Sequence, residues 1–132
     1  MKKILIVEDE LAYVKLLRDK LKDTYDVLDA PNGKLGLEMA KKHHPDLILL
    51  DNIMPEMDGM TMLNELRKDE YGKSAKVIIL TNLEVNSTII MQTVKTQPVY
   101  YFVKSDTNLS GLLEKINELL SEKQIDSQPK NA

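Results

Sequence analysis

The 132-residue sequence contains no cysteine and no tryptophan, and it has only one phenylalanine and five tyrosines. The lack of cysteine excludes disulfide bonds and thiolate metal sites. With so few aromatic side chains, a hydrophobic core has to be built mainly from Leu, Ile, Val and Met. The formal net charge of −3 gives no electrostatic reason to expect a nucleic acid or an acidic membrane as a direct partner.

The sequence also lacks a long hydrophobic run. The apolar residues 4–7 follow two lysines, like the start of a signal peptide, but the run ends at Glu8-Asp9-Glu10. This is too early for a signal core or a membrane span, so we expect a cytoplasmic protein. The length suits one domain. We place this domain at residues 1–120 and expect a polar, disordered tail at residues 121–132.

Short apolar runs alternate with longer amphipathic stretches. Ile4–Val7, Leu47–Leu50 and Val77–Leu80 show no polar alternation, as strands buried on both faces of a parallel sheet require. Tyr25–Asp29 and Val99–Val103 are weaker strand candidates that fit nearer the sheet edges. The alternation predicts an α/β fold of (βα)₅ type, a doubly wound five-stranded parallel sheet with helices on both faces.

Four stretches have the spacing of amphipathic helices. Their apolar stripes are Leu11, Val14, Leu17 and Leu21; Leu35, Leu37 and Met39; Met62, Leu63 and Leu66; and Leu109, Leu112, Leu113, Ile116, Leu119 and Leu120. Asp58 is the predicted N-cap of the third helix, and Asp106 or Asn108 that of the last. Residues 84–95 are rich in β-branched side chains, and we expect a helix there mainly because a crossover is required.

Polar residues stand at the ends of the central strands. Glu8-Asp9-Glu10 follows the first, Asp51 the third, Thr81 the fourth and Lys104 the fifth. In a doubly wound sheet the ligand site lies at these carboxyl ends, close to the switch point of strand order. The fold therefore predicts that these side chains meet, although they are far apart in the sequence.

The chemistry of such a cluster follows from its charges. Neighbouring carboxylates repel one another, and Mg²⁺ relieves the repulsion because it binds oxygen ligands. Asp51 can then act as a carboxylate nucleophile toward phosphorus and form an aspartyl phosphate. Lys104 supplies a compact positive charge and Thr81 a hydroxyl donor for the phosphoryl oxygens.

These residues lie in motifs that resemble the receiver domain of two-component response regulators, over residues 1 to about 120. The matching segments are Ile4-Leu5-Ile6-Val7-Glu8-Asp9-Glu10, Asp46-Leu47-Ile48-Leu49-Leu50-Asp51, Met54-Pro55-Glu56-Met57-Asp58-Gly59, Val77-Ile78-Ile79-Leu80-Thr81 and Tyr101-Phe102-Val103-Lys104. Each motif alone is weak, but their order and spacing together are specific. The resemblance implies a flavodoxin-like sheet with strand order 2-1-3-4-5.

The resemblance also assigns roles. It implies that Asp51 is the phosphoacceptor, that Asp9 binds the metal directly and that Glu8 holds metal-bound water. The backbone carbonyl of Ile53 would complete the metal ligands, for Mg²⁺ or alternatively Mn²⁺. Thr81 and Lys104 would bind the phosphoryl group, and Tyr101 matches the aromatic switch position.

A phosphorelay switch in signal transduction follows from these roles. The phosphodonor would be a sensor histidine kinase or a phosphotransfer protein. A downstream protein would dock on the face made by the fourth helix, fifth strand and fifth helix, and the protein would be a monomer or a phosphorylation-dependent dimer. Such a receiver catalyses its own phosphotransfer and autodephosphorylation and is not a multiple-turnover metabolic enzyme.

The sequence departs from the family pattern at several positions. Ser105 follows Lys104 where proline is common, Asn82 is larger than the usual residue after the threonine, and Thr96-Gln97-Pro98 replaces a frequent Gly-Ala pair. The apolar Ile53 and Leu83 flank the site and are expected to hinder an attacking water, which would slow dephosphorylation.

Other readings remain open at this point. Singly, the three acids read as a helix start, Asp51 as a turn residue, Thr81 as a cap and Lys104 as a surface charge; only their conjunction favours a site. A flavodoxin-like FMN binder would need a small, phosphate-cradling loop where the acids stand, and a haloacid-dehalogenase-type phosphatase would need an Asp at position 53. The remaining alternative is a degenerate receiver, a phosphorylation-independent protein interaction module.

Overall fold

The computed structural model describes residues 1–52, 57–81, 99–104 and 109–121. Five parallel strands form one sheet in the order β2-β1-β3-β4-β5, which confirms the predicted order. The strands are β1 (Lys3–Val7), β2 (Asp26–Ala30), β3 (Leu47–Asp51), β4 (Lys76–Thr81) and β5 (Val99–Val103). Each begins and ends within one residue of its predicted bounds.

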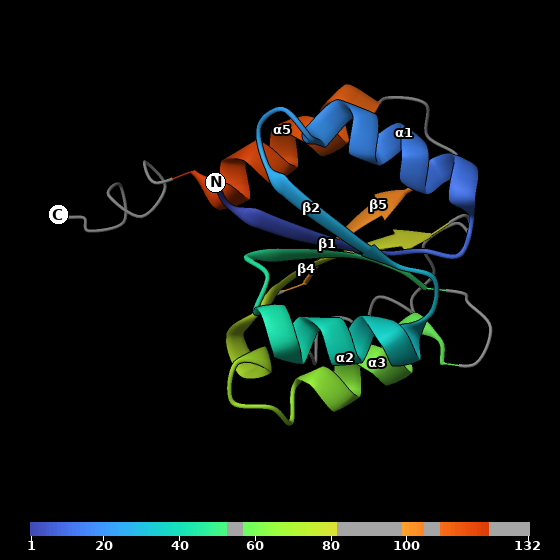
Figure 1. The fold of residues 1–132 in the computed structure, drawn as a ribbon, viewed down its shortest axis with the longest axis vertical. Helices are drawn as coiled ribbons and strands as arrows, with labels where there is room; N and C mark the ends of the chain where they lie inside the picture. The colour runs from blue at the N-terminus through green and yellow to red at the C-terminus, as the bar shows by residue number, and fades with distance from the viewer. Residues whose placement is uncertain (53–56, 82–98, 105–108, 122–132) are drawn as a thin grey trace, which may run out of the picture.

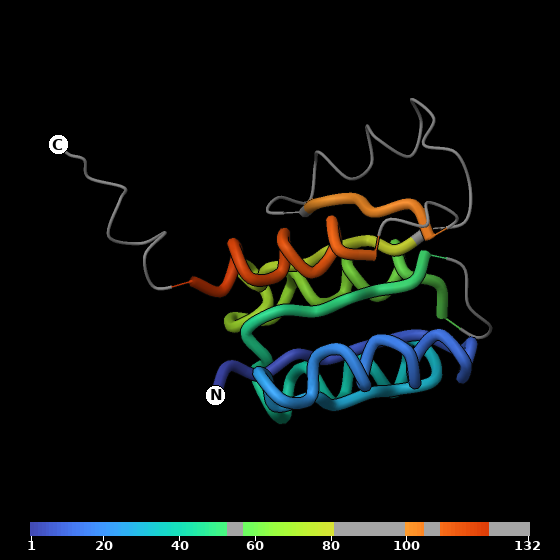
Figure 2. The backbone as a smooth tube through the Cα atoms, turned by 90° about the horizontal axis from the view of Figure 1, so that it is seen from above, coloured from blue at the N-terminus to red at the C-terminus, as the bar shows by residue number. Residues whose placement is uncertain are grey.

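Helices cover both faces of this sheet, as the doubly wound fold requires. The helices of the described residues are α1 (Leu11–Leu21), α2 (Gly33–His43), α3 (Gly59–Leu66) and α5 (Leu109–Leu120), with a short 3₁₀ helix at Gly72–Ser74. Helices α1 and α5 lie on one face, and α2 and α3 lie on the other (Figures 1 and 2). The predicted helix at residues 84–95 lies outside the described part of the chain.

The two faces of the sheet build two hydrophobic clusters. Ile4 and Ile6 pack with the side chains of α1 and α5, whereas Leu5 and Val7 pack with those of α2 and α3. All four side chains are fully buried. The uninterrupted apolar runs of the central strands are explained by this two-sided burial.

Two of the predicted helical stripes are wrong in part. Leu17 and Leu21 are buried in α1, but Leu11 is 77% exposed. At 3.6 residues per turn, Leu11 lies about 120° from Leu17 around the helix axis, away from the buried face. In α2, Leu35 is 42% exposed, because small residues face the sheet instead. A Cβ atom on Gly36 would lie only 2.7–2.8 Å from the methyl groups of Val7.

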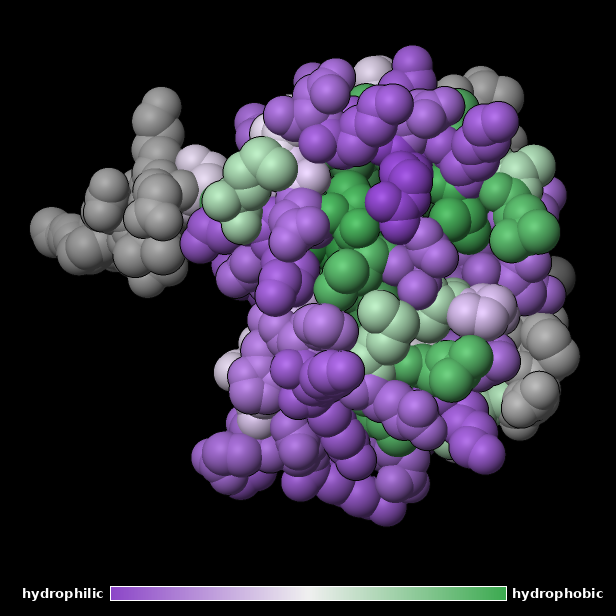
Figure 3. Space-filling view, in the orientation of Figure 1, coloured by the Kyte–Doolittle hydropathy of each residue, from purple (hydrophilic) through white to green (hydrophobic). Residues whose placement is uncertain are grey.

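The outer surface is mainly polar. Figure 3 shows hydrophilic side chains over both helical layers on the face that it presents, with a patchy hydrophobic band between them, where the edge strand β2 runs in Figure 1. In the described ranges no helix combines the length and the apolar character needed to cross a membrane.

A hollow of about 320 Å³ lies where strands β1, β3 and β4 begin. Tyr71 lines it: the hydroxyl donates a hydrogen bond to the Pro45 carbonyl at 2.7 Å, and the ring stacks on His44 with centroids 4.5 Å apart. Burial raises the pKa of Tyr71, and the charge of Asp46 raises it further against the opposing effect of Arg67. The hollow is at the opposite end of the sheet from the candidate site.

Candidate functional site

The sheet itself positions the site residues. Glu8 follows β1, and its backbone N–H donates to the carbonyl of Ala30 at 3.0 Å, which extends the pairing with β2. Asp51 is the last residue of β3, and the next residue, Asn52, donates to Leu80 on β4 at 2.9 Å. Because the strands are parallel, the polar residues at their carboxyl ends meet at one edge of the sheet.

Three carboxylates converge at this edge. Glu8, Asp9 and Asp51 each offer an oxygen, and these oxygens lie within 4.8 Å of one another. Glu8 and Asp51 are only 1% and 6% exposed, whereas Asp9 is exposed. Hard oxygen donors of this kind fit Mg²⁺, which binds proteins through one or two carboxylates plus waters. The exposed Asp9 leaves the cluster reachable from solvent.

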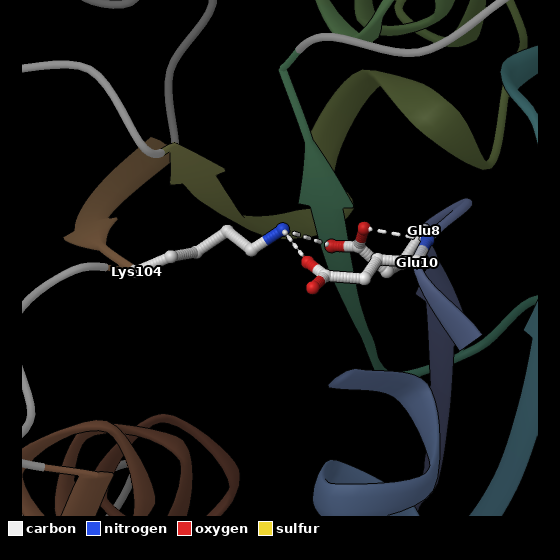
Figure 4. A network of polar contacts seen from close by, with 3 residues as sticks. All are labelled: Glu8, Glu10 and Lys104. Atoms are coloured by element: carbon white, nitrogen blue, oxygen red, sulfur yellow. Dashed lines mark hydrogen bonds and ion pairs between the residues drawn. The ribbon is translucent and has the colours of Figure 1, made fainter. Parts of the chain in front are cut away.

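Lys104 lies against Glu8, a member of this cluster, and against Glu10 (Figure 4). Its Nζ is 2.8 Å from Glu8 Oε1 and 3.4 Å from Glu10 Oε1, and its side chain is 4% exposed. The other oxygen of Glu8 accepts the backbone N–H of Glu10 at 3.0 Å. Both Glu8 oxygens therefore have partners, and one of those partners is the lysine.

The surroundings of Lys104 stabilise its charge. Burial lowers the pKa of the ammonium, but the hydrogen bond to Glu8 and the negative charges of Glu8 and Asp51 raise it by more, so that the net pKa lies above the ordinary value. A permanent positive charge is thus held beside a cluster of acids. Such a charge can balance negative oxygens that enter the site.

Sequence reasoning missed a further residue, Tyr13. The Nζ of Lys104 lies 4.6 Å from the centroid of its ring. Burial raises the pKa of its hydroxyl, the charge of Lys104 opposes this, and Glu8 is the first of the acids that add to it. The signal was available, because Tyr13 precedes the buried Leu17 by four residues and so lies on the same side of α1.

The other predicted residues are placed as follows. Thr81 ends β4, and its Cα pairs with that of Val103, the residue before Lys104. Tyr101 is half-buried on β5 and packs on the α2–α3 side of the sheet. Asp58 caps α3, because its Oδ1 accepts the N–H of Thr61 at 2.8 Å, which confirms the predicted cap.

Several sequence-based expectations lie outside the described residues. They concern Ile53, Asn82, Leu83, Thr96-Gln97-Pro98, Ser105, the caps Asp106 and Asn108, and the tail from residue 122 onward. The carboxylates and the lysine of the expected site, by contrast, are all described and meet at one edge of the sheet.

Comparison with known proteins gives a consistent result. A family model described as the response regulator receiver domain matches residues 4–117. Response regulator PleD of Caulobacter vibrioides is 41% identical over 83 residues, which make up 62% of this chain and 18% of PleD. The chain therefore spans much less than two thirds of that curated relative.

Solved structures resemble the chain over most of its length. TrrA, a response regulator protein from Thermotoga maritima solved in complex with Mg²⁺ and BeF, is 33% identical with a TM-score of 0.78, covering 91% of this chain and 100% of TrrA. The chemotaxis protein CheY4 from Vibrio cholerae is 26% identical with a TM-score of 0.83, covering 91% of this chain and 99% of CheY4.

Proposed function

The chain belongs to the response regulator receiver domain family, and from this premise we propose that it accepts a phosphoryl group on Asp51 in a Mg²⁺-dependent reaction. The observation that carries the proposal is the meeting of three carboxylates and one buried ammonium at the carboxyl ends of the strands. Asp51 is the natural acceptor, because it ends the central strand β3.

Asp9 and Asp51, with the backbone carbonyl of Ile53, would hold the ion, and Glu8 would hold its water. When bound, Mg²⁺ supplies positive charge that lowers the repulsion between the acids and an incoming phosphoryl group. The convergence of hard oxygen donors within 4.8 Å supports this assignment. Mn²⁺ prefers the same donors and is the alternative ion.

The transfer forms one bond and breaks one. A carboxylate oxygen of Asp51 forms a bond to phosphorus, and the bond from phosphorus to the histidine nitrogen of the donor breaks, with the electron pair leaving on that nitrogen. Lys104 moves from Glu8 to a phosphoryl oxygen and balances its charge. Thr81 donates its hydroxyl to a second oxygen.

The consequence of phosphorylation would be a change of partner. The donor would be a sensor histidine kinase or a phosphotransfer protein of a two-component system. Thr81 and Tyr101 would link the phosphoryl group to the face that includes β5 and α5, where a downstream protein docks. Ile53 and Leu83 would shield the phosphoryl group from water and slow its loss.

The test uses acetyl phosphate as a small donor, with and without Mg²⁺, and reads intact mass. We expect a Mg²⁺-dependent gain of one phosphoryl group in the wild type and none in Asp51→Asn. Asp58→Asn is the matched control, because it removes a nearby carboxylate that caps α3 and asparagine caps equally well; it should still be phosphorylated.

Beryllofluoride, a stable phosphoryl mimic, separates rapid hydrolysis from absence of reaction. If the wild type gains no mass but binds beryllofluoride with Mg²⁺, the adduct is short-lived. If it does neither, the phosphoacceptor function is wrong and the domain acts as a docking module. An adduct that persists in Asp51→Asn would assign the acceptor to another residue.

A further inference from the structure

Among the described residues, the short segment 8–13, which runs from the end of β1 into α1, contacts the ammonium of Lys104 through three side chains. Glu8, Glu10 and Tyr13 supply its contacts, at 2.8 Å and 3.4 Å from carboxylate oxygens and 4.6 Å from a ring centroid. The three contacts differ in kind, because Glu8 is fully buried, Glu10 is 58% exposed and Tyr13 carries no charge. The structure thus shows a resting position for Lys104 on the Glu8 side of the site.

The resting position of the Lys104 ammonium depends on the ring of Tyr13 and not on its hydroxyl. Among the described residues, the buried Tyr13 hydroxyl has no hydrogen-bond partner, which is unfavourable for a buried polar atom. The ring face, by contrast, attracts the ammonium through its quadrupole and keeps water from it. Phenylalanine would serve equally well in this role, and leucine would not.

We propose that Tyr13 is a positioning residue that, together with Glu10, holds the Lys104 ammonium against Glu8 before metal binding and thereby sets the affinity of the site for Mg²⁺. The inference rests on the proposed magnesium-dependent function. It goes beyond that function because it concerns the competition for Glu8 before any phosphoryl group is present.

The competition follows from charge. An ammonium held 2.8 Å from Glu8 Oε1 neutralises a carboxylate that would otherwise attract the divalent ion, and it also repels the ion directly. Weakening the hold on Lys104 therefore favours the ion. Tyr13 tests this cleanly, since its replacement by leucine changes no charge, whereas a change at Glu10 would also remove an anion that attracts Mg²⁺.

Calorimetric titration with Mg²⁺ compares the wild type, Tyr13→Leu and Tyr13→Phe. We expect Tyr13→Leu to bind Mg²⁺ about threefold to tenfold more tightly, the range that corresponds to a partly desolvated cation–π contact. Tyr13→Phe should match the wild type. Tyr100→Leu is the matched control, because Tyr100 makes a similar contact with Lys115, 4.8 Å from the ring centroid, and should leave the affinity unchanged.

A second measurement reports on Lys104 without any ion. The ¹⁵N NMR signal of a held, buried ammonium is protected from exchange with water; it should be present in the wild type and Tyr13→Phe and lost or broadened in Tyr13→Leu. In a Lys104→Met background, which has no ammonium to hold, Tyr13→Leu should no longer change the Mg²⁺ affinity. That loss of effect separates positioning from a general disturbance of the fold.

The outcomes distinguish this inference from the proposed function. If the wild type binds Mg²⁺ but Tyr13→Leu binds it equally well, the inference is overturned and the function stands. An effect of Tyr13→Leu that persists without Lys104, or an equal effect of Tyr13→Phe, also overturns it. If the wild type binds no Mg²⁺, the proposed function and this inference fall together.

Discussion

The carbonyl oxygen of Asp51 occupies the space that a Cβ atom on Gly59 would need. A Cβ atom on Gly59 would also lie 2.9 Å from the Cα of Asn52. The Gly59 N–H donates to the Asn52 carbonyl at 3.0 Å. Helix α3 therefore begins in direct contact with the backbone that carries the acceptor. Both obstacles are backbone atoms, so they cannot yield as a flexible side chain would.

Gly59→Ala should consequently displace the end of β3. We expect a loss of about 1–3 kcal/mol in the free energy of unfolding, as overpacking of a dense region produces, together with slower phosphorylation of Asp51. Urea unfolding and the acetyl phosphate assay measure the two effects. Thr61→Ala, at an exposed position of the same helix, should change stability by less than about 0.5 kcal/mol. Equal behaviour of the two variants would refute the close contact.

Lys104→Met should unfold more easily in the presence of a chelator. The substitution leaves Glu8 buried without its ammonium partner, and breaking a buried ion pair in this way costs about 3–5 kcal/mol. Saturating Mg²⁺ should restore part of the loss, because the ion replaces the missing charge.

Lys115→Met provides the comparison for that variant. Lys115 is 41% exposed and lies 3.6 Å from Glu118, and an exposed pair contributes about 1 kcal/mol or less. Urea unfolding of both variants with and without Mg²⁺ gives the contrast. If Lys104→Met loses no more unfolding free energy than Lys115→Met, the buried Lys104–Glu8 pair contributes no more to stability than an exposed pair.

Asp51→Asn should stabilise the ion-free protein. Asp51 shares its site with two other carboxylates within 4.8 Å, and removing one negative charge relieves repulsion worth about 1 kcal/mol or more. The gain in stability on adding Mg²⁺ should shrink in the same variant, since ligand binding to the native state is what produces that gain. Thermal melts in chelator and in Mg²⁺ measure both effects; a less stable ion-free variant would contradict the repulsion.

Tyr71 should contribute to alkaline unfolding. Its pKa is raised in the folded protein, first by burial, so above about pH 10 the unfolded chain ionises while the folded chain keeps its proton. The contribution of this raised pKa to the free energy of unfolding is fully present below about pH 10. It is lost as the pH rises toward the pKa of Tyr71 in the folded protein.

Tyr71→Phe isolates this effect. At pH 7 the variant should be less stable by about 1 kcal/mol, because it loses the hydrogen bond to Pro45. As the pH rises above about 10, the wild type should lose stability faster, so the difference should narrow. Urea midpoints between pH 7 and 11 measure it; a constant difference would show that Tyr71 titrates alike in both states.

The fold was largely predictable from the sequence because each central strand is a solid aliphatic run. Ile4–Val7 and Val77–Leu80 have no polar face, and a strand of that kind fits only between two helical layers. The α2 layer was less predictable, because Gly36 and Ala40 face the sheet there and small residues carry no hydrophobic signal. Because Leu35 is apolar, the sequence-based prediction placed the buried stripe of α2 on the wrong face of the helix.

The candidate site was predictable only as far as its charges. Strand ends identified Glu8, Asp51 and Lys104 as neighbours, because topology alone brings them together. Topology does not determine which carboxylate pairs with Lys104. The structure shows that its ammonium lies closest to Glu8 and farther from Glu10. The ring of Tyr13 escaped notice because an aromatic residue near a helix start is ordinarily core.

The pairing of Glu8 with Lys104 joins residues that are 96 positions apart in the chain. On a ribosome Glu8, Asp9 and Asp51 emerge long before Lys104, so a nascent chain that ends before residue 99 carries these three carboxylates without the lysine that pairs with Glu8. Contacts of such high sequence separation form late in folding. Docking of β5 at the sheet edge is therefore the step that brings the lysine to the acids, and an arrested chain lacking β5 should not bind the anionic beryllofluoride with the affinity of the finished protein.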